Sequence, residues 1–204
     1  PLANPSTYEV LRWVHREYPH LHTCVSTNGL LLPDRLDELM DAGLKALTVT
    51  INTLNLETAE AIYSWVRYEG RIYRGLEAAE LLVQNQWRGL REAAAAGMLV
   101  KVNTICLPRI NEDEIPSVAE AAGALGARIM NITALIPQGE LAHVGRPPRE
   151  KLDELRLESQ GHIRQMSHCR QCRADAAGLW NEEKDMEMEA LLAKIGDDYT
   201  DAVF

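Results

Sequence analysis

The chain has 204 residues, 46% of them hydrophobic and 25% charged, which suits one folded domain with an appendage. Its formal net charge of −9 argues against a duplex nucleic acid as partner, because nucleic acids bind basic surfaces. No apolar run approaches the roughly 20 residues needed to cross a bilayer. The first residues lack a signal-peptide pattern, so we expect a cytoplasmic protein without a membrane partner.

Helix and strand patterns alternate along the chain. The expected helices lie at about 6–18, 33–42 and 57–66, in an Ala/Leu-rich stretch ending at Ala96, and at about 112–126 and 148–167. The expected strands lie at about 21–26, 45–52, 98–107 and 128–135. Apolar strands that alternate with helices pair in parallel. The sequence therefore predicts an α/β fold with a parallel sheet.

Four strands are too few to close a β/α barrel, and a helix precedes the first of them. We therefore expect residues 1–137 to form an incomplete parallel β/α barrel of about four βα units that begins within a domain. Residues 138–180 are predicted to be a helical and coil extension. Residues 181–204 hold eight acidic residues against two lysines, which predicts an acidic tail that is solvated or loosely docked as a helix.

Cys169 and Cys172 form a C-x-x-C motif in the run HCRQCRAD. Two thiolates at this spacing can bend onto one metal ion or cluster, and the arginines around them favour the thiolate. A structural zinc would normally show a second C-x-x-C or a histidine pair, and a thioredoxin-type dithiol would follow a strand. Two unrelated surface cysteines are uncommon at this spacing. The motif therefore favours an iron–sulfur or other metal site.

Cys24 lies within the first expected strand, close to its carboxyl end, where parallel barrels build their sites. A lone cysteine is also often a buried core residue, and this is the better interpretation for Cys106 between two apolar neighbours.

Polar side chains also interrupt the apolar strands. These are Thr50 and Asn52 on the second expected strand, and Asn103 and Thr104 on the third. Such groups can contact a bound cofactor or cap the following helix. Lys101 could form a Schiff base with a carbonyl substrate, or it could pair with an acid.

The segment WVRYEGRIYRG at 65–75 concentrates cations and aromatic residues, and we expect it to be a loop. It could clamp an anionic ligand or form ordinary surface ion pairs.

Four stretches, CVSTNGL, TVTIN, WVRYEGRIYRG and HCRQCRADA, give the chain a family likeness. It resembles the NifB family of radical S-adenosylmethionine (SAM) proteins of nitrogenase cofactor biosynthesis, from Pro1 to about Trp180. The resemblance implies a partial barrel, a SAM-ligating [4Fe–4S] cluster and two precursor [4Fe–4S] clusters. The precursors would be fused, with insertion of a carbide from the SAM methyl group and a further sulfur, into the 8Fe precursor of the FeMo cofactor.

The resemblance also implies roles for single residues. Cys169 and Cys172 would bind one precursor cluster and Cys24 the other. Thr50 would lie near SAM, and Val102 would contact SAM through its backbone and packing. The partners would be an iron–sulfur cluster donor and cofactor-carrier or maturation proteins.

One motif of the family is not found in these 204 residues, the C-x-x-x-C-x-x-C that leaves one iron open to SAM. We therefore expect this chain alone not to cleave SAM, with the missing barrel unit lying upstream or in another chain. Two alternatives stay open: a lysine-dependent aldolase that uses Lys101, and a non-catalytic carrier or scaffold that binds a cluster at Cys169 and Cys172 for transfer.

Overall fold

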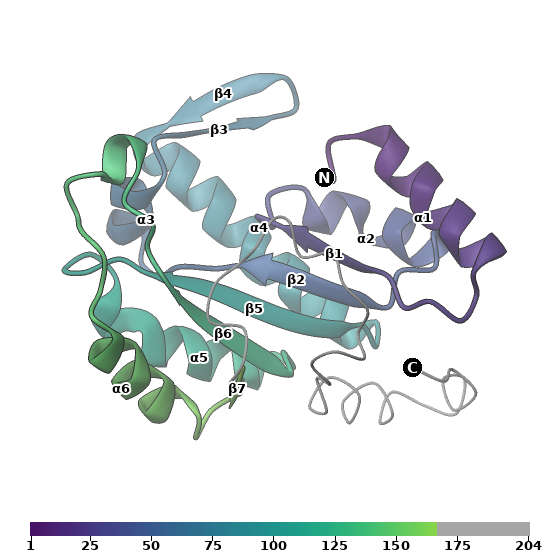
Figure 1. The fold of residues 1–204 in the computed structure, drawn as a ribbon. Coiled ribbons are helices and arrows are strands. Elements are labelled where there is room, and N and C mark those ends of the chain that lie inside the picture. The colour runs from purple at the N-terminus through teal and green to yellow at the C-terminus, as the bar shows by residue number, and fades with distance from the viewer. Residues whose placement is uncertain (167–204) are drawn as a thin grey trace.

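A computed structural model describes residues 1–166 of the chain, so Cys169, Cys172 and the acidic tail lie outside the described residues. The centre of the described part is a five-stranded parallel sheet with strand order β1-β2-β5-β6-β7 (Figure 1). Its strands are β1 (Cys24–Thr27), β2 (Ala46–Thr50), β5 (Leu99–Cys106), β6 (Ile129–Ala134) and β7 (Arg164–Gln165). A separate antiparallel hairpin consists of β3 (Trp65–Tyr68) and β4 (Arg71–Arg74).

Six α-helices alternate with these strands in the described residues. They are α1 (Pro5–Glu17), α2 (Leu32–Asp41), α3 (Leu56–Ile62), α4 (Gly75–Ala95), α5 (Ile115–Ala124) and α6 (Arg149–Ser159). Two short 3₁₀ helices, η1 (Glu112–Glu114) and η2 (Gly139–Leu141), complete the connections. None of the helices in residues 1–166 is long and apolar enough to cross a membrane.

The two faces of the sheet differ because side chains alternate along each strand. One face carries aliphatic residues that share a core with the helices, among them Val25, Leu47, Val49, Val100 and Val102. The opposite face carries Ser26, Thr48, Thr50, Lys101, Asn103 and Asn131 in matching register. One face is therefore covered by helices, as in half of a β/α barrel, and the other presents polar groups.

The predicted α/β fold with a parallel sheet is confirmed, and each of the four expected strands is present. Three local predictions are wrong. The helix expected at 57–66 ends at Ile62, and the expected loop after it is the β3–β4 hairpin. The helix expected at 148–167 ends at Ser159, and β7 follows it as a fifth strand.

The hairpin closes through a tight turn in which Glu69 and Gly70 both have positive φ, +48° and +80°. Such a turn twists in the same sense as the strands that it joins, which explains why it connects a two-stranded ribbon. In Figure 1 the hairpin stands above the sheet and over α4. Its base follows α3 and leads directly into α4, so both ends of the ribbon are held by helices.

Candidate functional site

A row of three polar residues crosses the face of the sheet opposite the one that the helices cover, which we call the open face. Thr50 lies opposite Asn103, and Asn103 lies opposite Asn131, on three adjacent strands. The Oδ1 atoms of Asn103 and Asn131 are both buried and accept no hydrogen bond. A buried amide oxygen without a donor costs free energy, which a bound molecule or an ordered water can offset by supplying the donor. The row therefore has the character of a ligand-binding wall.

A second row lies one step toward the amino ends of the strands. It contains Ser26, Thr48 and Lys101 in consecutive register. Lys101, proposed above as a Schiff-base lysine, thus lies on the polar face, between Thr48 and Ile129. The two rows together place polar side chains on β1, β2, β5 and β6 of the open face, beside the apolar Leu99 and Ile129.

Cys24 belongs to the same polar face. The sequence had suggested a position near the carboxyl end of the strand. Cys24 is instead the first residue of β1, so it lies at the amino end. The Sγ atom of Cys24 lies 3.7 Å from Oγ1 of Thr48 on the neighbouring strand, and Cys24 is exposed. Its position allows a thiolate to face the open side of the sheet.

Two residues of α4 fix the carboxyl ends of β1 and β2. Nε2 of the buried Gln86 donates to the carbonyl oxygens of Asn28 and Thr50, both at 2.9 Å. Nδ2 of Asn85 donates to the carbonyl oxygen of Leu30 at 2.8 Å. Gly29 has a positive φ of +84°, and a Cβ there would come within 2.8 Å of Cγ of Gln86. This pair was not predicted from the sequence, in which three successive amides inside the apolar helix run LLVQNQW were the available signal.

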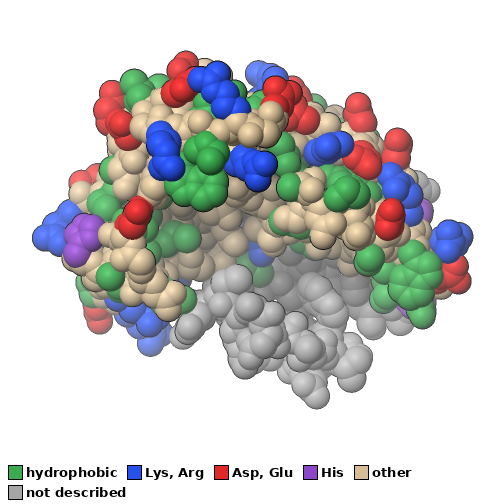
Figure 2. All heavy atoms as spheres, turned by 90° about the horizontal axis from the view of Figure 1, so that it is seen from above, with side chains coloured by type: hydrophobic (Ala, Val, Ile, Leu, Met, Phe, Trp, Pro, Cys, Tyr) green, Lys and Arg blue, Asp and Glu red, His purple; other side chains and the backbone are tan. Residues whose placement is uncertain are grey.

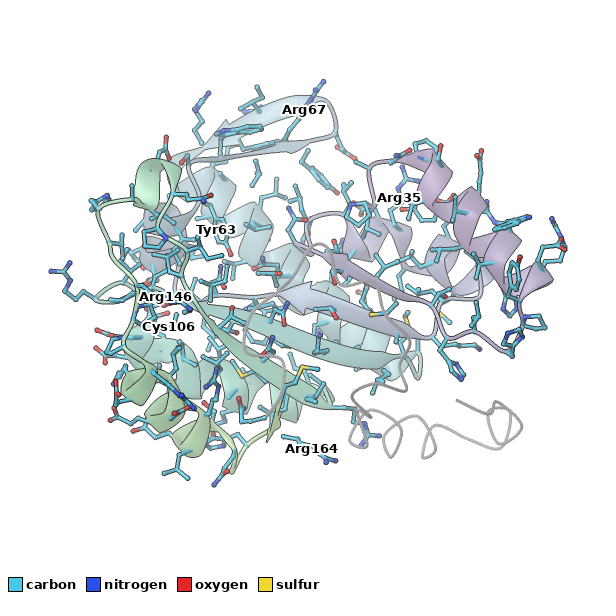
Figure 3. The ribbon with its side chains drawn as sticks, viewed as in Figure 1. Arg35, Tyr63, Arg67, Cys106, Arg146 and Arg164 are labelled. Atoms are coloured by element: carbon cyan, nitrogen blue, oxygen red, sulfur yellow. The ribbon has the colours of Figure 1, made fainter. Side chains whose placement is uncertain are left out.

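A groove of about 560 Å³ opens beside these strand ends. Its wall includes Ser26, Thr27, Asn28 and Thr50 from the sheet edge, Pro1, Leu2 and Ala3 from the amino end, Leu30 and Leu31, and Trp65, Val66 and Arg67 from the hairpin. Figure 3 shows the Arg67 side chain projecting from the hairpin above this region. A volume of this size is typical of small-molecule sites.

Two further candidates lie on the other face. The Val102 side chain is fully buried in the core between sheet and helices, so it can reach the open face only through its backbone. Cys106 is also fully buried there, as predicted, and burial raises the pKa of its thiol to about 11. A neutral, enclosed thiol is a poor metal ligand. Cys106 is therefore a core residue.

The side chains of Asn52 and Thr104, two candidate ligand contacts, are instead hydrogen-bonded within the fold. Asn52 accepts from the Ile105 amide at 2.9 Å and donates to the Tyr63 hydroxyl at 2.9 Å. Thr104 donates to the carbonyl oxygen of Ile51 at 2.7 Å. Burial raises the pKa of Tyr63, although hydrogen bonds from Gln86 and Asn52 act in the opposite direction. This network sets the loop after β2 against β5.

Buried Asn111, which was not predicted from the sequence, completes that network. Its Nδ2 donates to the carbonyl oxygens of Asn52 and Ile105, at 2.8 and 2.9 Å, and its Oδ1 accepts from the Leu107 amide at 2.8 Å. Each polar atom of this amide is used by the backbone, so Asn111 is a structural residue.

The polar wall fits SAM, whose ammonium, hydroxyl and amino groups are donors for the two free amide oxygens. The described residues do not fit a SAM-ligating cluster in the same way. Residues 1–166 contain no group of three or more side chains placed to hold a metal ion. Of the four cysteines, Cys24 is the one within this range that faces the open side, and Cys169 and Cys172 lie outside it. The described residues therefore do not supply the three thiolates that such a cluster needs.

Comparison with known proteins agrees with this geometry. The model of the "Radical SAM superfamily" matches residues 1–122, which include β1, β2, β5 and the hairpin. The chain therefore belongs to the radical SAM superfamily.

Within this superfamily the chain is similar to curated proteins named "FeMo cofactor biosynthesis protein NifB". The protein of Klebsiella pneumoniae is 41% identical over 200 residues, which are 95% of this chain and 43% of that protein. The proteins of Methanocaldococcus infernus and Methanocaldococcus jannaschii are each 37% identical, over 90% and 91% of this chain and 60% and 62% of their own length. The resemblance seen in the sequence is thus confirmed, and the chain spans about half the length of these relatives.

Proposed function

We propose that this chain is part of the barrel of a radical SAM enzyme of FeMo cofactor biosynthesis. The observation that carries the proposal is the pair of buried, unpartnered amide oxygens of Asn103 and Asn131 on the open face of a radical SAM sheet. The similarity to NifB proteins supports the choice of pathway.

The chain's own residues would bind and orient SAM. Asn103 and Asn131 accept hydrogen bonds from it, Thr50 lies in the same row, and Val102 contributes backbone and packing beneath them. Gln86 holds the carboxyl ends of β1 and β2 at their spacing. When bound to a reduced cluster, SAM supplies radical chemistry and, by the family likeness, a methyl-derived carbon.

The substrates would be two [4Fe–4S] clusters. Cys24 would bind one of them on the open side of the sheet, and Cys169 and Cys172 would bind the other. The product would be the carbide-containing 8Fe precursor, received by carrier or maturation proteins, and a cluster donor would supply the starting clusters. A cationic neighbourhood around the C-x-x-C favours its thiolates.

The Schiff-base alternative has one observation in its favour, because Lys101 does lie on the polar face. Borohydride trapping of a carbonyl compound on Lys101 is its test. The carrier alternative predicts that the chain binds iron but never SAM.

The proposed cluster ligands can be tested on this chain after anaerobic reconstitution with iron and sulfide. We expect Cys24→Ala, and separately Cys169→Ala with Cys172→Ala, each to remove about one cluster's worth of iron. Cys106→Ala is the matched control and should leave the iron content unchanged, because its thiol is enclosed in the core. An iron content that neither Cys24→Ala nor the Cys169→Ala/Cys172→Ala pair lowers would contradict the assignment.

A further inference from the structure

The β3–β4 hairpin presents one face that takes no part in the fold. Trp65 lies opposite Arg74, and Arg67 lies opposite Ile72, so these four side chains share one side of the ribbon. We call them the outer hairpin face. All four are exposed, and Trp65 and Ile72 each keep 52% of their surface. Figure 2 shows cationic, acidic and hydrophobic side chains mixed on this side of the molecule.

The other side of the ribbon anchors it. Val66 packs with Leu30, Ala78 and Leu82 in a small core. The Tyr68 hydroxyl donates to Oδ2 of Asp34 on α2 at 2.8 Å. Because these contacts hold the hairpin, the outer hairpin face is free to bind something else.

The charges of the outer hairpin face are unbalanced. Within the described residues, the side chains of Arg67 and Arg74 have no hydrogen-bond or ion-pair partner, whereas nearby Arg71 pairs with Glu77 at 3.4 Å and stacks on Tyr73. Trp and Arg are the residues most enriched in binding hot spots. Two free cations beside two large apolar groups suit an acidic segment with an apolar stripe.

The chain contains such a segment outside the described residues. We propose that the acidic segment 181–204 of this same chain docks on the outer hairpin face. It carries a net charge of −6, with five of its acids between Glu182 and Glu189. Met188, Leu191, Leu192 and Ile195 recur at the spacing of one helix face. The acids would pair with Arg67 and Arg74 while the apolar stripe covers Trp65 and Ile72.

The length of chain between the two partners allows this contact. β7 runs parallel to β6, so the chain leaves Gln165 toward the sheet edge where the strands carry their carboxyl ends. The sheet is about 19 Å wide from β7 to β1, at about 4.8 Å per strand. Residues 167–181 can extend over about 50 Å. Linkage in one chain also raises the effective concentration of the segment.

This inference does not rest on the proposed function. The outer hairpin face also borders the groove, because Trp65 and Arg67 line it. A docked segment would lie at the rim of this groove, whose wall also includes Thr50.

Photo-crosslinking in the full chain tests the proposal. Ile72 is replaced by p-benzoylphenylalanine, the protein is irradiated at low concentration, and the crosslinked peptide is identified by mass spectrometry. We expect crosslinks to residues 181–204 whose yield does not change on dilution. Arg67→Gln with Arg74→Gln should lower the yield by about fivefold, as the loss of two exposed ion pairs allows. Neutralising the acids at 182, 183, 185, 187 and 189 to amides should have the same effect.

Arg71→Gln is the matched control, because it removes the same charge from the same hairpin but from a residue already paired with Glu77. It should leave the yield nearly unchanged. Three results would overturn the proposal: no crosslink to residues 181–204, a yield that falls on dilution and so reports a second copy, or a yield insensitive to Arg67 and Arg74. The substituted side chains of the hairpin, Arg67, Arg71, Ile72 and Arg74, are exposed, so the fold is retained and circular dichroism verifies it.

Discussion

The side chain of Gln86 donates to the main-chain oxygen of Thr50 at 2.9 Å and links the middle of α4 to the carboxyl end of β2. The same Nε2 atom reaches the oxygen of Asn28 at the end of β1. One buried amide thus sets the spacing of two strand ends that line the groove. Residues at these ends point toward a ligand only if the ends themselves are held.

Replacing Gln86 by leucine should therefore destabilise the chain. The two carbonyl oxygens would lose their buried donor, at a cost of about 2–3 kcal/mol in the free energy of unfolding. Gln84→Leu, an exposed position on the same helix, should change it by less than about 0.5 kcal/mol. Urea denaturation of both variants measures the difference. Equal stabilities would contradict the structural role of Gln86.

Asn131→Leu should behave in the opposite way. Its buried Oδ1 has no donor, so an apolar side chain of similar size should leave stability unchanged or raise it by about 1 kcal/mol. Asn52→Leu is the matched control, because both polar atoms of Asn52 are bonded. That substitution should cost about 2 kcal/mol. Denaturation curves that show similar losses for both would refute the view that Asn131 is reserved for a ligand.

Stability should fall in alkali because of Cys106. Burial raises the pKa of its thiol to about 11 in the folded chain, from an ordinary value of 9.0 in the unfolded chain. Below pH 9 both states carry the proton, and this residue contributes no pH dependence. Between pH 9 and about 11 the unfolded state loses the proton first, so the free energy of unfolding decreases as pH rises. Cys106→Ala should show a shallower decrease over this range, and identical slopes would exclude the effect.

The sheet could be predicted because its four longer strands are apolar runs that lie between helix patterns in the sequence. The hairpin was missed although Trp65–Tyr68 and Arg71–Arg74 both alternate, because its turn is Glu-Gly and not the stronger Asn-Gly or Asp-Gly signal. β7 has two polar residues and no apolar pattern. β7 forms because it pairs with the free edge of β6. This pairing is a tertiary interaction, so the local sequence does not predict it.

The candidate site was foreseen in part. Thr50 and Asn103 stood out as polar groups in apolar strands, and the structure places them side by side. Asn131 occupies a similar position on β6 but was not singled out. Asn52 looked the same as Thr50 in the sequence, yet the hydrogen bonds that occupy it come from residues far along the chain. Which polar groups are free depends on such partners.

The proposed binding of SAM to the open face of this sheet is tested most directly by a chimera in which this chain replaces the matching segment of the Klebsiella pneumoniae NifB protein. SAM affinity is measured anaerobically in the reconstituted chimera and in its Asn131→Leu variant. We predict that the chimera binds SAM and that the substitution weakens binding about tenfold, as expected for the loss of one strong hydrogen bond. A folded, iron-loaded chimera that does not bind SAM, or that binds it equally well with Asn131→Leu, would contradict SAM binding at the open face.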